Sequence, residues 1–159
     1  MESVIIMKKV ISGSAFFLLL DQLIKCLIQS FLELNQSITI IPDFFHITYT
    51  RNTGAAWSIL EGNTLILIGI TFLALYYLYE FFLKNQTFTK LDILTYSLLI
   101  GGILGNLIDR IFLHSVVDYL DFTFFSYHFP IFNLADSCIV IGVGLLIIKI
   151  LRGEKHGAH

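Results

Sequence analysis

The sequence predicts an all-α polytopic membrane protein with four transmembrane helices, a small extracytoplasmic β-sheet or hairpin, and a short extracytoplasmic loop or helix between the third and fourth spans. Two observations lead to this fold class. Hydrophobic residues make up 56% of the chain and charged residues only 14%, whereas about a quarter of an ordinary soluble domain is charged. The mean hydropathy is +0.80, and apolar stretches recur with the length of about 20 residues that a helix needs to cross a bilayer.

Four stretches are long and apolar enough to be spans, and they are residues 10–32, 64–83, 93–113 and 131–151. A basic pair, Lys8 and Lys9, precedes the first span, as it would in a signal peptide. No small-x-small cleavage site follows, so we expect this span to stay uncleaved. No linker or change of composition divides the chain, and residues 1–159 are therefore expected to form a single integral membrane domain.

The basic residues predict the orientation of the spans, because cytoplasmic segments retain lysine and arginine. Arg51 alone lies in the connections on one side of the spans. The other side carries seven basic residues, which are Lys8, Lys9, Lys84, Lys90, Lys149, Arg152 and Lys155. Both termini are therefore expected in the cytoplasm, with the connections 33–63 and 114–130 facing outward.

The first outward connection, 33–63, is too long for a simple loop between neighbouring spans. It contains "SITII" and "FFHITYT", which are rich in β-branched and aromatic residues and are bounded by turn-forming residues at Pro42-Asp43 and Asn52-Thr53-Gly54. This pattern is typical of strands. We expect the β-hairpin or sheet to form here, on the membrane surface.

The charge and the distribution of metal-binding residue types exclude several function classes. The net charge is only −2, with no basic patch of the kind that nucleic-acid binding requires. Cys26 and Cys138 stand alone in apolar stretches, and the five histidines form no metal-binding motif. We therefore expect no nucleic-acid partner, no metal and no cofactor.

The stretch "GNLIDRIFLHSVVDYLDF", residues 105–122, carries unusually many polar residues for so apolar a chain. One of them is Asp118, which on its own is equally well explained as an exposed aspartate. The connection 114–130 is short, however, so the third and fourth spans should be neighbours. This arrangement would bring Asp118 to the same outer end as Asp136.

Asp136 follows Asn133 by three residues, so the two share one helical face. Either residue would suit a helix N-cap only if the helix begins later than Pro130 suggests. Otherwise the carboxyl group of Asp136 lies within the span, just below the outer membrane surface.

Two neighbouring carboxyl groups cannot both ionise cheaply, so a pair shares one proton. The ionised member can take a proton from water while the protonated member polarises a peptide carbonyl, which is the chemistry of an aspartyl peptidase. A serine or cysteine mechanism is less favoured, because no GxSxG motif occurs and no histidine lies near either cysteine in sequence.

The remaining polar residues within the spans have a structural explanation as well as a functional one. Gly101 and Gly105 have the GxxxG spacing of close helix packing. Asp109 and Arg110 could solvate the outer end of the third span, whereas the deeper Asn106 requires partners inside the bundle.

In the first span, Asp21 and Lys25 are four residues apart in the favourable order for an ion pair. Neutralisation within the bundle explains this pair better than a proton relay does. In the outward connection, Arg51 could pair with a lipid phosphate or an acidic side chain, and Asn52 could bind an extended peptide. Gly54 marks either a tight turn or room for a ligand.

Five segments stand in order along the four predicted spans, and they are "DQLIK" (21–25), "RNTGAAWS" (51–58), "GNLIDR" (105–110), "VVDYLDF" (116–122) and "FNLADS" (132–137). Together they closely resemble the lipoprotein signal peptidase family, the type II signal peptidases of bacteria, over nearly the whole chain. The resemblance implies an aspartyl intramembrane endopeptidase of family A8. Such an enzyme removes the signal peptide from prolipoproteins by cutting just before a cysteine that carries diacylglycerol.

By this resemblance, Asp118 and Asp136 are the catalytic pair, and Asp21 with Lys25 is a structural pair. The positions that match supporting or substrate-binding residues are Asn52, Gly54, Asn106, Asp109, Arg110, Asn133 and Ala135. The expected partners are prolipoproteins carrying diacylglyceryl-cysteine and membrane lipids, and we expect a monomer. The expected location is the bacterial cytoplasmic membrane, with the active site near its outer face.

Three positions depart from the family pattern. His114 stands where glycine is usual, and Tyr119 and Trp57 stand where phenylalanine is common. Histidine adopts a left-handed backbone less readily than glycine, so the geometry just before Asp118 is the point most affected.

Two other functions compete with a peptidase. A small transporter or proton conductor would use Asp21, Lys25, Asp109 and Asp136 as a path across the bilayer. The ionisable residues cluster toward the outer end, however, rather than being spread through the depth of the membrane. A non-catalytic assembly factor would explain the GxxxG spacing but would leave the aspartate pair without a role.

Overall fold

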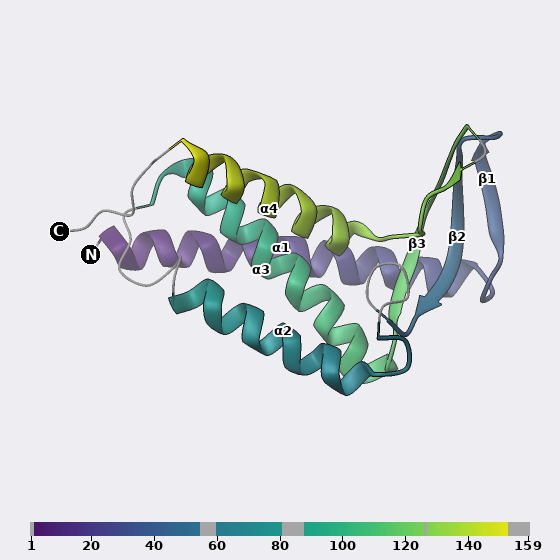
Figure 1. Cartoon of the computed structure of the whole chain (residues 1–159), viewed down its shortest axis with the longest axis horizontal. Coiled ribbons are helices and arrows are strands. Elements are labelled where there is room, and N and C mark those ends of the chain that lie inside the picture. Colours follow the sequence, from purple (N-terminus) through teal and green to yellow (C-terminus); the bar gives the residue numbers. More distant parts are fainter. Residues whose placement is uncertain (1, 55–59, 81–87, 126, 153–159) are drawn as a thin grey trace.

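The computed structural model describes residues 2–54, 60–80, 88–125 and 127–152. Figure 1 shows helices running alongside one another, with a β-sheet standing across one end of them. Along the chain the elements are α1 (Glu2–Phe31), β1 (Ser37–Ile41), β2 (Phe45–Asn52), α2 (Thr64–Leu78), α3 (Lys90–Leu113), β3 (Val116–Phe124), β4 (Tyr127–His128) and α4 (Leu134–Leu151).

Three of the helices are long and apolar enough to cross a membrane, and they are Val4–Phe31 within α1, Lys90–Leu113 and Leu134–Leu151. The helix α2 is apolar but has only 15 residues, about 22 Å at 1.5 Å per residue. It occupies the predicted second span, of which residues 81–83 lie outside the described residues. The fold is therefore a membrane protein with three long apolar helices, a shorter one and a sheet.

The helix α3 packs against each of the other three helices. Its glycines permit close approach, because a Cβ atom at Gly101 would lie 2.8 Å from the Ser14 carbonyl oxygen of α1. On another side, a Cβ at Gly102 would lie 2.5 Å from the Ala135 carbonyl oxygen of α4. The close packing predicted from the glycine spacing is confirmed, and it sets α1 and α4 near enough to α3 for their polar side chains to meet.

The sheet has four antiparallel strands in the order β1-β2-β3-β4. A hairpin or sheet was predicted for the connection 33–63, and β1 and β2 form it. The connection 114–130 was predicted to be a loop or helix, and this was wrong because β3 and β4 occupy it. The physical reason is the sequence "VVDYLDFTF", whose β-branched and aromatic residues suit a strand and pair with the edge of β2, placing Asp118 opposite Thr50.

Two apolar clusters lie at opposite ends of the helices. Where the sheet meets α1, the buried cluster consists of Leu32, Tyr49 and Val117. Toward the end where α1 begins, a second buried cluster consists of Val10, Leu78, Tyr96 and Leu99. The buried polar residues Asp21, Lys25, Asn106 and Asp109 come from the segment of the helices nearer the sheet.

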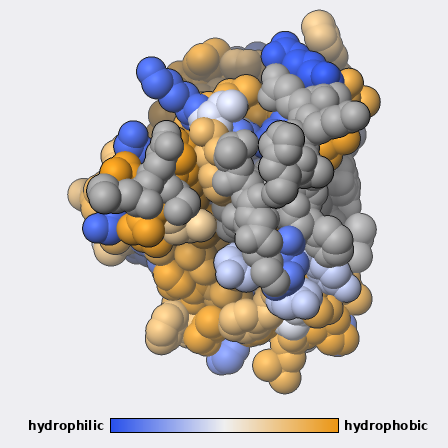
Figure 2. Space-filling model, turned by 90° about the vertical axis from the view of Figure 1, so that its left-hand side faces the viewer, coloured by the Kyte–Doolittle hydropathy of each residue, from blue (hydrophilic) through white to orange (hydrophobic). Residues whose placement is uncertain are grey.

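The outer surface of the helices is strongly apolar. Figure 2 looks onto the end opposite the sheet and shows hydrophobic residues around the flanks, with hydrophilic residues in separate groups. Large apolar side chains such as Leu19, Leu65 and Val140 are mostly exposed on α1, α2 and α4. Such a surface fits a hydrocarbon environment, where exposed leucine and valine carry no penalty.

Candidate active site

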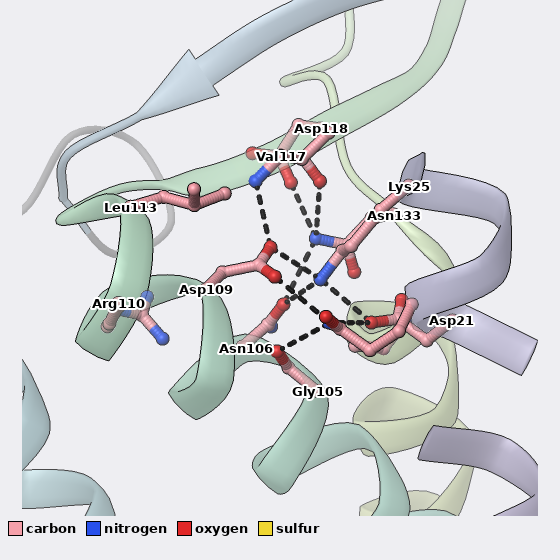
Figure 3. Close-up of polar contacts among 12 residues, drawn as sticks. Asp21, Lys25, Gly105, Asn106, Asp109, Arg110, Leu113, Val117, Asp118 and Asn133 are labelled. Carbon is pink, nitrogen blue, oxygen red and sulfur yellow. Dashed lines mark hydrogen bonds and ion pairs between the residues drawn. The ribbon is translucent and has the colours of Figure 1, made fainter. Parts of the chain in front are cut away.

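The two candidate aspartates line one cavity of about 530 Å³. Asp118 comes from β3, and Asp136 comes from the first turn of α4. Asn52, Asn106 and Arg110 also line this cavity. The short β3–β4 segment between α3 and α4 therefore does bring the two carboxyl groups to one end of the bundle. Figure 3 shows the polar residues from α1, α3, β3 and the start of α4 pointing toward one another around this site.

The start of α4 fixes the position of Asp136. Asn133 is the N-cap, since its side chain accepts a hydrogen bond from the Asp136 backbone N–H at 2.9 Å. In return, Asp136 Oδ2 accepts from the Asn133 backbone N–H at 3.2 Å, which completes a capping box. Phe132 pairs with Leu120 of β3 as an extended residue, so the helix begins at Leu134, three residues after the start of the predicted span at residue 131.

Asp118 is buried, with 2% of its surface exposed. Its Oδ1 accepts a hydrogen bond of 2.6 Å from Asn133 Nδ2, and its Oδ2 accepts one of 3.2 Å from Asn52 Nδ2. Burial, and then the negative charge of Asp136, raise the pKa of Asp118 to about 7, against the opposing effect of these hydrogen bonds. At neutral pH this carboxyl group can therefore gain or lose a proton.

Asn106 of α3 connects the aspartate of α4 to the helix α1. Its Nδ2 donates to Asp136 Oδ1 at 2.7 Å. Its Oδ1 accepts from Lys25 Nζ at 3.0 Å and from Asn133 Nδ2 at 3.1 Å. An ammonium group has only donors, so Lys25 requires the amide oxygen on its own side and thereby turns the amide NH₂ toward Asp136.

Lys25 lies in a buried group of charges with Asp21 and Asp109. Its Nζ is 2.8 Å from Asp21 Oδ2 and 2.9 Å from Asp109 Oδ2. Each carboxylate also accepts a hydrogen bond from the backbone of another element. Asp21 accepts from the Ala135 N–H of α4 at 3.0 Å, and Asp109 accepts from the Val117 N–H of β3 at 3.1 Å. The charge group thus ties α1 to the start of α4 and ties α3 to the strand that carries Asp118.

Arg110 lines the cavity, and it bonds to Gly54, which follows β2. Arg110 Nη2 donates to the Gly54 carbonyl oxygen at 3.2 Å, and the Gly54 N–H donates to Asn52 Oδ1 at 2.9 Å. The second bond turns the Asn52 amide so that its NH₂ group faces Asp118. Arg51 is directed elsewhere and donates to Tyr49 and Gln29.

Two side chains that bond to the site were not predicted as site residues, although Tyr119 had been noted as a departure from the family pattern. Gln22 Nε2 donates to Asp109 Oδ1 at 2.9 Å and to the Gly105 carbonyl oxygen at 3.2 Å. The Tyr119 hydroxyl accepts from the Leu134 N–H at 3.1 Å. An amide between two charged residues of an apolar span was an available signal for Gln22, whereas the reach of Tyr119 depends on tertiary structure.

The described residues also show whether side chains could together bind a metal ion. Within residues 2–54, 60–80, 88–125 and 127–152, no three histidine, cysteine or acidic side chains gather in a metal-binding arrangement.

Comparison with known proteins places this arrangement in a family. Residues 14–152, which include all the candidate site residues, match the family model described as Signal peptidase (SPase) II. The chain belongs to the signal peptidase II family. Family membership favours a peptidase over the competing transporter and assembly factor. A peptidase also gives the pair of Asp118 and Asp136 a role, which the other two functions do not.

Curated members of the signal peptidase II family match along nearly their whole length. A lipoprotein signal peptidase of Halothermothrix orenii is 45% identical over 140 residues, which is 88% of this chain and 93% of that protein. A lipoprotein signal peptidase of Staphylococcus aureus is 42% identical over 143 residues, which is 90% of this chain and 88% of that protein.

Solved structures agree with the fold of this signal peptidase II family member. One, described as a bacterial membrane enzyme determined by the in meso method at 2.3 Å resolution, has a TM-score of 0.83 at 39% identity and covers 94% of this chain and 92% of its own. A second bacterial membrane enzyme, at 1.9 Å resolution, has a TM-score of 0.79 at 42% identity and covers 89% of this chain and 92% of its own.

Proposed function

We propose that Asp118 and Asp136 are the catalytic pair of this lipoprotein signal peptidase, which removes signal peptides from prolipoproteins. The observation that carries the assignment is that both carboxyl groups line one cavity and are joined through the amides of Asn133 and Asn106. Amides hydrogen-bonded to two carboxyl groups hold them in place without contributing a third charge.

In the proposed reaction the pair shares one proton. The ionised aspartate accepts a proton from water, and the water oxygen forms a bond to the peptide carbonyl carbon. The protonated aspartate hydrogen-bonds to the carbonyl oxygen. When the C–N bond breaks, the leaving nitrogen takes a proton from the aspartate pair and becomes the new amino terminus, and the carbonyl carbon with the water oxygen becomes the new carboxyl group. The pKa of about 7 for Asp118 supports this scheme, because it allows the pair to hold one proton at neutral pH.

The proposed substrate is a prolipoprotein whose cysteine carries diacylglycerol. Apolar residues of α4, Ile139, Val140 and Ile141, line the cavity together with Phe129 and Ile131. Val140 is 71% exposed on the apolar outer surface, so the cavity wall continues into the surface that faces lipid. A lipid-bearing residue could enter sideways along such a wall without crossing water.

We further propose four spans with both termini in the cytoplasm and the site near the outer face of the bacterial cytoplasmic membrane. The excess of lysine and arginine around residues 8–9, 84–90 and 149–155 of the sequence supports this orientation. Residues 1–159 would then act as one membrane domain and as a monomer.

The experiment compares purified wild-type protein with Asp118→Asn and Asp136→Asn. Each is incubated with lipidated and with unlipidated prolipoprotein in detergent, and signal peptide release is followed on a gel. We expect cleavage of the lipidated substrate by the wild type only. Asp121→Asn is the matched control, because Asp121 lies on the same strand but bonds Thr48 instead of the site; it should cleave normally. Substantial cleavage by either dyad variant would reject the assignment.

A further inference from the structure

The first turn of a helix leaves backbone N–H groups without partners inside the helix. At the start of α4 two of these groups bond within the helix start itself, and two bond to other elements of the protein. The Asn133 and Asp136 N–H groups bond within the capping box. The Ala135 N–H donates to Asp21 of α1 at 3.0 Å, and the Leu134 N–H donates to the Tyr119 hydroxyl of β3 at 3.1 Å. The turn that carries Asp136 is therefore held from outside at two points.

The bond from Leu134 to Tyr119 joins the two elements that carry the aspartates. Tyr119 directly follows Asp118 on β3, and Leu134 is two residues before Asp136 on α4. Asp118 itself accepts from Asn133, the residue before Leu134. Two successive residues of β3 thus bond two successive residues at the start of α4.

Backbone pairing brings the strand to this point, and the hydroxyl extends the connection into the helix. The Tyr119 and Leu120 N–H groups both donate to the Phe132 carbonyl oxygen, at 3.0 and 2.8 Å. The Phe132 N–H donates back to Leu120 at 3.1 Å. These bonds stop at Phe132, outside the helix, so the hydroxyl of Tyr119 is the contact from this strand to the backbone of the α4 first turn.

The environment of Tyr119 keeps its hydroxyl neutral and in place. The side chain is 4% exposed, and its burial raises the pKa of the phenol above its usual value. A neutral hydroxyl has lone pairs for a backbone donor, and a buried ring has little freedom to turn away from it. Tyr119 does not line the cavity, so it has no direct contact with a substrate placed there.

We infer that Tyr119 is a positioning residue for the reaction, whose hydroxyl sets the separation and angle of the two aspartates by joining β3 to the first turn of α4. This inference rests on the proposed function, because it assigns Tyr119 a role only through Asp118 and Asp136. Catalytic groups must be held within about 0.5 Å of their working geometry. A single hydrogen bond between the elements that carry them is sufficient to change their relative position by that much.

The test removes the hydroxyl in Tyr119→Phe and measures kcat, KM and the melting temperature in one detergent. The matched control is Tyr96→Phe, because Tyr96 is fully buried and its hydroxyl has no hydrogen-bond partner among the described residues. We expect Tyr119→Phe to lower kcat per folded molecule about 3- to 10-fold, the effect of one hydrogen bond, with KM within about twofold. Tyr96→Phe should leave kcat and KM unchanged.

A second variant removes the same bond from its other side. Leu134 occupies the first helical position, where proline is favoured and needs no N–H group, and Asn133 before it is already extended at φ −133°. Leu134→Pro therefore deletes the donor and leaves Tyr119 intact. We expect a similar loss in kcat, and the double variant should lose no more than either single variant, since one bond is removed in all three.

Several results would overturn the inference. One is a Tyr119→Phe protein that keeps the wild-type kcat and shows only a lower melting temperature, and another is an equal loss of kcat in Tyr119→Phe and Tyr96→Phe. A change in Tyr119→Phe that is confined to KM, or losses of kcat that add up in the double variant, would also overturn it. A loss as complete as that of Asp118→Asn would also overturn it in favour of direct chemistry. Failure of the proposed function is distinguishable, because in that case Asp118→Asn itself would retain cleavage.

Discussion

Replacing Asp118 by asparagine should change how the stability of the folded protein depends on pH. The carboxyl group is buried, and its pKa is raised from 3.8 to about 7 by burial and by the charge of Asp136. In the unfolded chain it ionises near 3.8. Between about pH 4 and pH 7 the unfolded chain loses this proton while the folded protein keeps it. The free energy of unfolding contributed by this group is therefore fully present below about pH 4 and is lost as the pH rises to about 7.

The size of the effect follows from the pKa difference. Each pKa unit corresponds to about 1.4 kcal/mol, so a difference of about three units lowers the free energy of unfolding of the wild type by about 4 kcal/mol between about pH 4 and pH 8. Asparagine does not titrate and avoids this loss. Its NH₂ group, however, faces one of the two amide donors, from Asn52 or Asn133, at a cost of about 1–3 kcal/mol at every pH. The variant should therefore be less stable than the wild type near about pH 4 and more stable near about pH 8.

The assay is reversible unfolding of both proteins in one detergent, followed by circular dichroism at several values between about pH 4 and pH 8. Tyr96→Phe is the control, because it changes no group that titrates in this range, and its difference from the wild type should be constant. A constant difference between Asp118→Asn and the wild type across the same range would refute the reasoning, because the buried carboxyl group would then not be coupled to folding.

Three further substitutions test the supporting structure by unfolding in detergent. Lys25→Met should lower the free energy of unfolding by about 3–5 kcal/mol, because two buried carboxylates lose their cation; adding Asp21→Asn should recover part of this, and an unchanged melting temperature for Lys25→Met would contradict it. Gly105→Ala should cost about 1–3 kcal/mol, since the new Cβ would lie 2.6 Å from Asp21 Oδ2, whereas Gly144→Ala, with no atom within 4 Å of its Cβ, should be neutral or stabilising. His114→Gly should stabilise by about 0.5–1 kcal/mol, because His114 has a left-handed backbone with φ 55°; destabilisation would show that its side chain contributes more than this strain.

The helices were predictable because a bilayer imposes a length and a composition on them. Their ends were less predictable. The helix α1 begins at Glu2, before residue 10 where the predicted span starts, since residues 2–9 continue the helix beyond the most apolar stretch. The helix α4 begins later than predicted, because Asn133 supplies an N-cap that competes with the signal from Pro130.

The third strand was missed for a physical reason. Residues 116–124 alternate too little to be recognised as a half-buried strand, and their pairing depends on the free edge of β2, which lies far away in sequence. The left-handed backbone at His114, in contrast, agrees with the expectation that this position favours glycine.

The sequence led to Asp118 and Asp136 because a short connection restricts where two spans can lie. It did not reveal the amide connections between them, since the partners of Asn106 and Asn133 come from α1, β3 and α4 at once. The added hydroxyl of Tyr119 looked like a mild change from phenylalanine, and its bond to Leu134 depends on where the helix begins. Trp57 lies outside the described residues.

Lys25 and Asp21 are four residues apart on α1, so their ion pair forms within a single helix. This matters during biogenesis, when α1 emerges from the ribosome before α3 and α4 exist. A lone cation in the hydrocarbon would resist transfer from the translocon into lipid, whereas a pair already neutralised along one turn can enter with a smaller barrier. When α3 and α4 follow, Asp109 and the backbone N–H of Ala135 can bond to a pair that is already in place within α1.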